Sequence, residues 1–97
     1  VTILPISEKY NQAAKDLSAL LNNSDIRSLV DERAEKIGKK IRDAELQRIP
    51  YMLILGEKEV ESGQLSVRQQ GKGDLGSFSV EDFRALIEEE IDKLLHA

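Results

Sequence analysis

The sequence has 97 residues, 40% of them hydrophobic, and a net charge of −4, so it suits one ordinary domain without the overall basic character common in nucleic-acid-binding proteins. It contains no cysteine and a single histidine, His96, which excludes disulfides, cysteine nucleophiles and thiolate metal sites and argues against His-ligated metals and histidine-based triads. No apolar run approaches the roughly 20 residues of a membrane-spanning helix, and the first residues lack the charged start and cleavage site of a signal peptide.

The first half of the chain predicts two strands, each followed by a helix. Residues 1–6 are apolar and β-branched, as in a buried strand, and Ser7 offers a hydroxyl that can cap the helix after it. A second short strand is expected over residues 26–31 and a second helix over residues 35–49, which Pro50 ends because proline disfavours the α conformation before it. The residues at helical spacing are Tyr10, Ala13, Ala14, Leu17, Leu20 and Leu21 in the first helix and Ile37, Ile41, Ala44 and Leu46 in the second.

The second half predicts a central strand, a hairpin and a last helix. Residues 51–55 are continuously apolar, as in a strand covered on both faces. Residues 57–61 and 64–70 flank a Ser-Gly turn and predict a hairpin, and the glycine-rich residues 71–76 predict a loop. Residues 79–82 fit the capping-box pattern at the start of a helix. Its apolar face comprises Phe83, Leu86, Ile87, Ile91, Leu94 and Leu95.

This order of elements predicts an α/β fold, a three-layer α/β/α sandwich with a mixed sheet of about five strands and three main helices. The two strand-helix-strand connections imply parallel strands, to which the hairpin adds antiparallel ones. Since disordered residues usually precede a first strand, the abrupt start at Val1 predicts a single domain over residues 1–97 that was excised from a larger protein.

Charge is distributed unevenly along the chain. Residues 33–48 carry six basic side chains against three acidic ones, whereas residues 77–97 carry six acidic against two basic. On a helix, Lys36 and Lys40 would stand on an exposed flank with Lys39 beside them, a row that suits phosphate oxygens. The same row also fits a solvated helix face with pairs such as Glu35 to Lys39, so both interpretations stay open. Gly38, inside this helix, implies either a tight packing contact or the close approach of a ligand backbone.

Other clusters give little support for catalysis. The glycines at 71, 73 and 76 superficially form GxGxxG, but they follow an edge hairpin instead of a first strand, so a dinucleotide site is not indicated. Carboxylates at 57, 59 and 61 alternate along the expected strand, where they suit solvated edge charges better than a hard-metal site. Since the sequence has no visible nucleophile–base pair, we expect no catalytic residue and no metal site.

Taken together, the central residues resemble a known family. The matching runs are DERAEKIGKKIRDA at 31–44, QRIPYML at 47–53, GEKEVESG at 56–63, LSVR at 65–68 and DLGS at 74–77. They are similar to the C-terminal anticodon-binding domain of threonyl-tRNA synthetases, class II enzymes, and the resemblance extends over essentially the whole chain. Prolyl, glycyl and histidyl synthetases share the architecture, but the GEKEVESG and Val67-Arg68 residues are typical of the threonyl enzymes.

The resemblance implies that the domain binds the anticodon loop of threonine tRNA and reads its middle guanine and the following uracil. Arg68 and Glu59 match the family's base-reading arginine and glutamate, and the expected hairpin would let them converge on one base. Arginine can donate two hydrogen bonds to guanine O6 and N7, a carboxylate can accept from imino and amino groups, and single-stranded loop bases expose those edges. The residues expected at backbone phosphates, by position and charge, are Lys36, Lys39, Arg42 and Arg48.

Two departures from the family pattern alter the expected contacts. Ala34 stands where the family commonly has a base-reading asparagine, so that contact is absent or supplied elsewhere. Gln69 and Gln70 follow Arg68 where the family tends to stay basic, which predicts weaker phosphate affinity.

The resemblance also implies properties of the parent protein. It would be a cytoplasmic, homodimeric threonine–tRNA ligase whose catalytic domain uses ATP and zinc, whereas this domain binds no cofactor. An alternative use of the same fold is a non-catalytic protein-interaction or accessory module. A small-molecule-binding or hydrolytic domain is disfavoured, because the sequence lacks a phosphate loop and a metal-ligand cluster.

Overall fold

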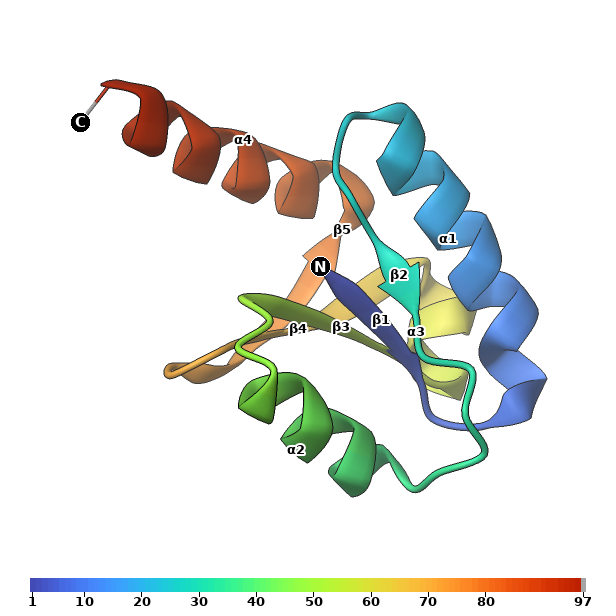
Figure 1. Cartoon of the computed structure of the whole chain (residues 1–97). Coiled ribbons are helices and arrows are strands. Elements are labelled where there is room, and N and C mark those ends of the chain that lie inside the picture. Colours follow the sequence, from blue (N-terminus) through green and yellow to red (C-terminus); the bar gives the residue numbers. More distant parts are fainter. Residues whose placement is uncertain (97) are drawn as a thin grey trace.

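A five-stranded mixed sheet runs through the molecule in the order β2-β1-β3-β4-β5 (Figure 1). The computed structural model describes the backbone of residues 1–96 and the side chains of residues 1–90. The strands are β1 (Thr2–Pro5), β2 (Leu29–Val30), β3 (Tyr51–Leu55), β4 (Gln64–Gln69) and β5 (Gly73–Ser79). The helices are α1 (Asn11–Asn23, after a 3-10 turn at Glu8–Tyr10), α2 (Ile37–Leu46), α3 (Glu57–Ser62) and α4 (Val80–His96).

The first three strands are parallel and the last two are antiparallel, as the order of elements predicted. β1 lies between β2 and β3 and runs parallel to both. β4 then pairs antiparallel with β3 and with β5. The predicted strand over residues 26–31 shortens to β2, because the Ile26 N–H bonds back to Leu21 of α1 and only two residues pair with β1.

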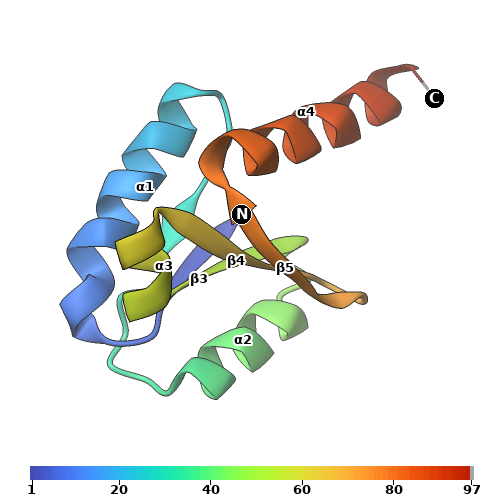
Figure 2. The ribbon, with the colours of Figure 1, turned by 180° about the vertical axis from the view of Figure 1, so that it is seen from behind.

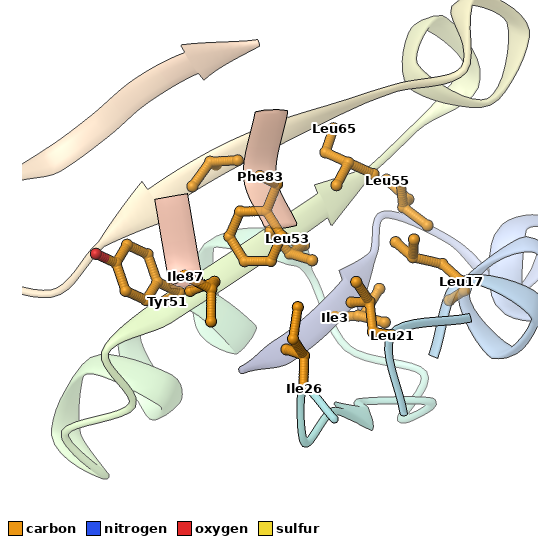
Figure 3. Close-up of a cluster of buried hydrophobic side chains, with 12 residues drawn as sticks. Ile3, Leu17, Leu21, Ile26, Tyr51, Leu53, Leu55, Leu65, Phe83 and Ile87 are labelled. Carbon is orange, nitrogen blue, oxygen red and sulfur yellow. The ribbon is translucent and has the colours of Figure 1, made fainter. Parts of the chain in front are cut away.

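Helices cover both faces of the sheet, which confirms the three-layer prediction (Figures 1 and 2). Alternate residues of β3 point to opposite sides, so one apolar strand serves two cores. The larger core joins the sheet to α1 and α4, and Figure 3 shows Phe83 beside Tyr51 and Leu53 within it. The smaller core lies under α2 and contains Leu4, Ala44 and Met52, with Ile37, Ile41, Ile49 and Ile54 packed against it.

The capping prediction for α4 is confirmed on one side, because the Ser79 hydroxyl accepts the Asp82 N–H at 3.1 Å. Phe83 and Ile87 are buried and Leu86 is half-buried, as the apolar pattern of this helix predicted. Ile91, Leu94 and Leu95 lie outside the residues whose side chains are described. The prediction for Ser7 is wrong in one respect, because its hydroxyl caps no backbone N–H.

Helices α1 and α2 end in the same way, with a non-glycine residue in the left-handed conformation. Asp25 has φ 62° and Arg48 has φ 58°. The N–H of the next residue, Ile26 or Ile49, bonds back to Leu21 or Ala44, as in a Schellman motif. The predicted helix over residues 35–49 is therefore shorter at its C-terminal end, because the chain reverses before Pro50.

The prediction of a hairpin over residues 57–61 and 64–70 is wrong. Residues 57–62 form α3, since Gly56 is extended and Gly63, at φ 71°, closes the helix in the left-handed conformation. The Glu59 carboxylate accepts the Gly56 N–H at 3.0 Å, and two acidic residues in the first turn complement the helix dipole.

The true hairpin joins β4 to β5, so most of the expected loop over residues 71–76 is strand. Gly71 and Gly73 flank the turn with positive φ, and a bulge interrupts the pairing after Val67, opposite Gly76. The sheet thus reaches the predicted five strands through a different pair of segments.

Candidate nucleic-acid interface

One face of the β4–β5 hairpin is polar and lies on the same side of the sheet as α2. Leu65, Val67 and Phe78 of these strands turn toward the larger core, so their neighbours point the opposite way. The core under α2 draws its sheet residues from β1 and β3 alone. We call the remaining surface the open sheet face, and all its side chains are exposed or half-buried; its residues are Gln64, Ser66, Arg68, Asp74, Ser77 and Ser79.

Arg68 is the one cation of the open sheet face. It lies between Met52 and Asp74 in the register of the sheet. Its Nη2 lies 3.8 Å from Glu45 Oε1 on α2, and its side chain is 29% exposed. Its buried Nε has no acceptor among the described residues. A single long ion pair leaves most of the guanidinium donors available to a ligand.

Glu59 does not lie beside Arg68, contrary to the sequence prediction. It belongs to α3, which begins after β3 ends at Leu55, whereas Arg68 pairs with Met52 near the start of β3. The strand between Met52 and Leu55 alone spans about 10 Å at about 3.3 Å per residue. The two side chains therefore start from separate elements about 10 Å or more apart along the sheet, and not from adjacent hairpin strands as expected. One Glu59 oxygen is engaged by Gly56, which leaves the other oxygen as an acceptor.

Ala34 lies at the same end of the sheet as Glu59, where the parallel strands finish. The segment over residues 31–36, here called the 31–36 loop, connects β2 to α2 and lines a shallow hollow together with Ile6, Ser7 and Lys9. Clefts at the carboxyl ends of parallel strands are common binding places in α/β proteins. The hollow presents the small, apolar Ala34 beside cationic Lys9 and Lys36.

The four predicted phosphate-binding residues are spread along α2 and do not form one cluster. Lys36 precedes the first turn and is exposed, and Lys39 pairs with Glu35 at 3.4 Å. Arg42 is exposed and makes no ion pair with any described residue. Arg48 lies past the other end of α2, in a hollow with Arg27 and Leu29 at the start of the parallel strands. α2 thus carries cations along its whole length.

Two cations of this segment have structural partners that the sequence pattern did not reveal. Lys40 was expected on an exposed flank, but it is 2% exposed and its Nζ donates to the Pro5 and Asp31 carbonyls at 3.0 Å each. Arg33 bridges the carboxylates of Asp31 and Asp43 at 2.8 and 3.0 Å. The hydrogen bonds from Arg33 lower the pKa of Asp31 below its ordinary value, despite partial burial.

Gly38 has no packing role in the structure. A Cβ added there would meet nothing within 4 Å, and the residue is exposed on α2. The tight helix–sheet contact considered from the sequence is therefore absent.

Among the residues described, no three His, Cys, Asp or Glu side chains are grouped to hold a metal ion. No helix within that part of the chain is long and apolar enough to cross a membrane.

Comparison with known proteins gives consistent matches over the whole chain. A family model described as "Anticodon binding domain" matches residues 1–90. The threonine–tRNA ligases of Phocaeicola vulgatus and Parabacteroides distasonis are 52% and 53% identical to the chain over 96 residues, which is 99% of the chain and 15% of each relative. The chain therefore spans about 15% of the length of the curated relatives it matches.

Solved structures agree with the fold. The RNA binding domain of threonyl-tRNA synthetase from Cryptosporidium parvum Iowa II superposes with a TM-score of 0.85 at 26% identity, over 91% of this chain and 22% of that one. Prolyl-tRNA synthetase from the same genus and species has a TM-score of 0.81 at 15% identity, over 95% of this chain and 20% of that one. At that identity, the prolyl structure supports the fold alone.

Proposed function

We propose that this chain, which belongs to the family of anticodon-binding domains, binds the anticodon loop of threonine tRNA as the recognition module of a threonine–tRNA ligase. The observation that carries the proposal is the open sheet face, where Arg68 offers guanidinium donors beside a cation-bearing helix. Identity of about 52% to threonine–tRNA ligases over nearly the whole chain supports threonine tRNA as the partner.

Arg68 and Glu59 have the chemistry to read two different bases. A guanidinium donates two parallel hydrogen bonds to guanine O6 and N7, which assigns Arg68 to the middle guanine. The free carboxylate oxygen of Glu59 can accept from the imino N–H of the following uracil. Bases of a single-stranded loop can be splayed apart, so a separation of about 10 Å or more between the two contacts is compatible with adjacent nucleotides.

Lys36, Lys39, Arg42 and Arg48 are assigned to backbone phosphates. Lys36 and Arg42 stand about 9 Å apart along α2 at 1.5 Å per residue, and Arg48 extends the row past the helix end. Such contacts position the RNA without reading its sequence. The acidic residues of α4 lie across the sheet from α2, which keeps their repulsion away from this surface (Figure 2).

The remaining functions belong to the rest of the parent protein. We infer that a separate catalytic domain joins threonine to tRNA with ATP and holds the zinc ion, while this domain supplies no catalytic residue and binds no cofactor. The parent would be a cytoplasmic homodimer in which this domain contacts the catalytic domain.

The alternative function is a protein-interaction or accessory module that keeps the fold without binding RNA. Its supporting observation is the exposure of Leu29 and Leu46, at 74% and 76%, near the hollow that contains Arg48.

A binding titration at several salt concentrations distinguishes the two proposed functions. The isolated domain is titrated with a threonine anticodon stem-loop and with a stem-loop whose middle base is changed. RNA recognition predicts tighter binding of the threonine loop and a log Kd against log salt slope of about 3 in magnitude, because four cations each contribute about 0.7 on single strands. Equal affinities with no salt dependence favour the accessory module.

A further inference from the structure

Lys40 is the one charged side chain that is fully buried among the residues whose side chains are described. It reaches from α2 to the carbonyl oxygens of Pro5, at the end of β1, and Asp31, just after β2. Carbonyls at strand ends have no ladder partner, so each gains from a side-chain donor. One lysine therefore connects α2 to two neighbouring strands at the end of the sheet where Glu59 lies.

Arg33 makes a second connection, on the solvent side of the same segment. Its Nε and Nη2 bond both carboxylate oxygens of Asp31, at 2.9 and 2.8 Å, and its Nη1 bonds Asp43 on α2 at 3.0 Å. The 31–36 loop has no strand or helix of its own. Lys40 on the buried side and Arg33 on the solvent side thus hold the Asp31 end of the loop against α2.

We propose that Lys40 and the Arg33–Asp43 bridge are positioning elements of the RNA interface, which hold the 31–36 loop in its binding conformation before RNA arrives. The inference rests on the proposed function, because Ala34 and Lys36 are on this loop. Lys40 is too deeply buried to contact RNA itself. A loop that is ordered in advance spares the conformational entropy that binding would otherwise lose.

Substitution of Lys40 by methionine tests the first element, since it preserves the length and packing of the side chain and removes its donors. We expect faster amide hydrogen exchange in the 31–36 loop and an affinity for the threonine stem-loop that is about five- to tenfold weaker. The salt slope stays at the wild-type value, because no phosphate contact is lost. Arg42→Met is the matched control: it weakens binding and lowers the salt slope by about 0.7 without loosening the loop, because Arg42 makes no ion pair with any described residue.

Asp43→Asn tests the second element with a sign that electrostatics alone cannot produce. Loss of an acidic group near RNA favours phosphate binding, whereas the neutral amide oxygen of asparagine accepts from Arg33 more weakly than a carboxylate, which loosens the loop and weakens binding. We expect about two- to fivefold weaker binding, the effect of partly freeing one loop anchor. Glu45→Gln on the same helix is the control; it removes the same charge without touching the loop and also releases Arg68 from its ion pair, so we expect it to bind RNA more tightly.

The outcomes are distinct from failure of the proposed function. If wild type binds no stem-loop, the RNA assignment fails, while hydrogen exchange still decides whether Lys40 and Asp43 order the loop. Unchanged exchange in the 31–36 loop, or wild-type affinity in Lys40→Met and in Asp43→Asn, overturns the positioning role. Should Lys40→Met not fold, Asp43→Asn carries the test, since Asp43 is only half-buried. A general loss of stability is recognised with Leu17→Ala, a core variant of α1 whose affinity should not change while it is folded.

Discussion

Arg68 and Glu59 lie toward opposite ends of β3. Arg68 pairs with Met52 near the first residue of the strand, whereas Glu59 belongs to α3, which follows Leu55, the last residue of the strand. The two proposed base contacts are thus separate sites, and this geometry sets the first prediction.

Substitution of Arg68 by alanine should weaken binding of the threonine stem-loop by roughly 1–3 kcal/mol and relax discrimination at the middle base. Glu59→Gln should instead relax discrimination at the following base, while glutamine keeps an acceptor for the Gly56 N–H. Because the sites are more than about 7–10 Å apart, the two losses should add within about 0.5 kcal/mol in the double variant. Strong coupling in titrations of all four proteins would show that both side chains hold one base.

Arg48 and Asp25 allow a direct test of backbone strain against charge. Both occupy a left-handed position after a helix, where glycine is favoured. We expect Arg48→Gly and Asp25→Gly to raise the free energy of unfolding by about 0.5–1 kcal/mol, with the smaller gain for Asp25 because aspartate tolerates this conformation better. Urea denaturation measures both changes.

The same pair tests the phosphate assignment of Arg48. Arg48→Gly should lower the salt slope of RNA binding by about 0.7 while the fold becomes more stable. Asp25→Gly, the control, should leave the slope unchanged. A more stable Arg48→Gly protein with the wild-type slope would remove Arg48 from the interface.

Gly38 and Gly63 differ in backbone angle but not in surrounding space, since neither has an atom within 4 Å of an added Cβ. Gly38 lies in α2 and Gly63 has φ 71°. Gly38→Ala should therefore stabilise the fold by about 0.5–1 kcal/mol through helix propensity. Gly63→Ala should destabilise it by about 1 kcal/mol, because alanine is strained in the left-handed region. Thermal unfolding of both variants is the measurement, and a destabilised Gly38→Ala would point to a contact that the structure does not show.

Periodicity predicted the parts of the fold that burial dictates. The run over residues 51–55 forms β3, and Ile37 and Ile41 face the sheet, because burial against the sheet removes their apolar surface from water. Alternation failed at residues 57–61, where glutamates two apart fit a strand and a helix equally well. The flanking Gly56 and Gly63, which set the helix ends, carried the deciding signal.

The site was less predictable because it depends on long-range partners. Lys40 has the same charge as its neighbours Lys36 and Lys39, and it was the Pro5 and Asp31 carbonyls, distant in sequence, that the pattern could not reveal as its partners. Arg68 was assigned to a hairpin strand, correctly, but its partner strand was not the expected one. Family resemblance identified Arg68 and Glu59 as candidates, whereas their separation required the structure.

Because of Tyr51, the stability of the fold depends on pH in the alkaline range. Burial of the phenol, and then the charge and hydrogen bond of Glu90 on α4, raise the pKa of Tyr51 above its ordinary value of 10.0. The folded state thus retains the phenolic proton more strongly than the unfolded chain. This contribution to stability is complete below pH 10 and is lost as the pH rises through the raised pKa.

Tyr51→Phe removes the titrating group and keeps the ring, which packs edge-on against Phe83 with 6.0 Å between ring centroids. At pH 8 we expect the variant to be less stable by about 0.5–1.5 kcal/mol, the net value of one hydrogen bond. Between pH 10 and 12 wild type should lose stability faster than Tyr51→Phe, so the gap narrows. The difference between the pH–stability curves of the two proteins cancels any loss of stability that both share. A gap that stays constant from pH 8 to 12 would mean that Tyr51 does not ionise differently in the folded and unfolded states.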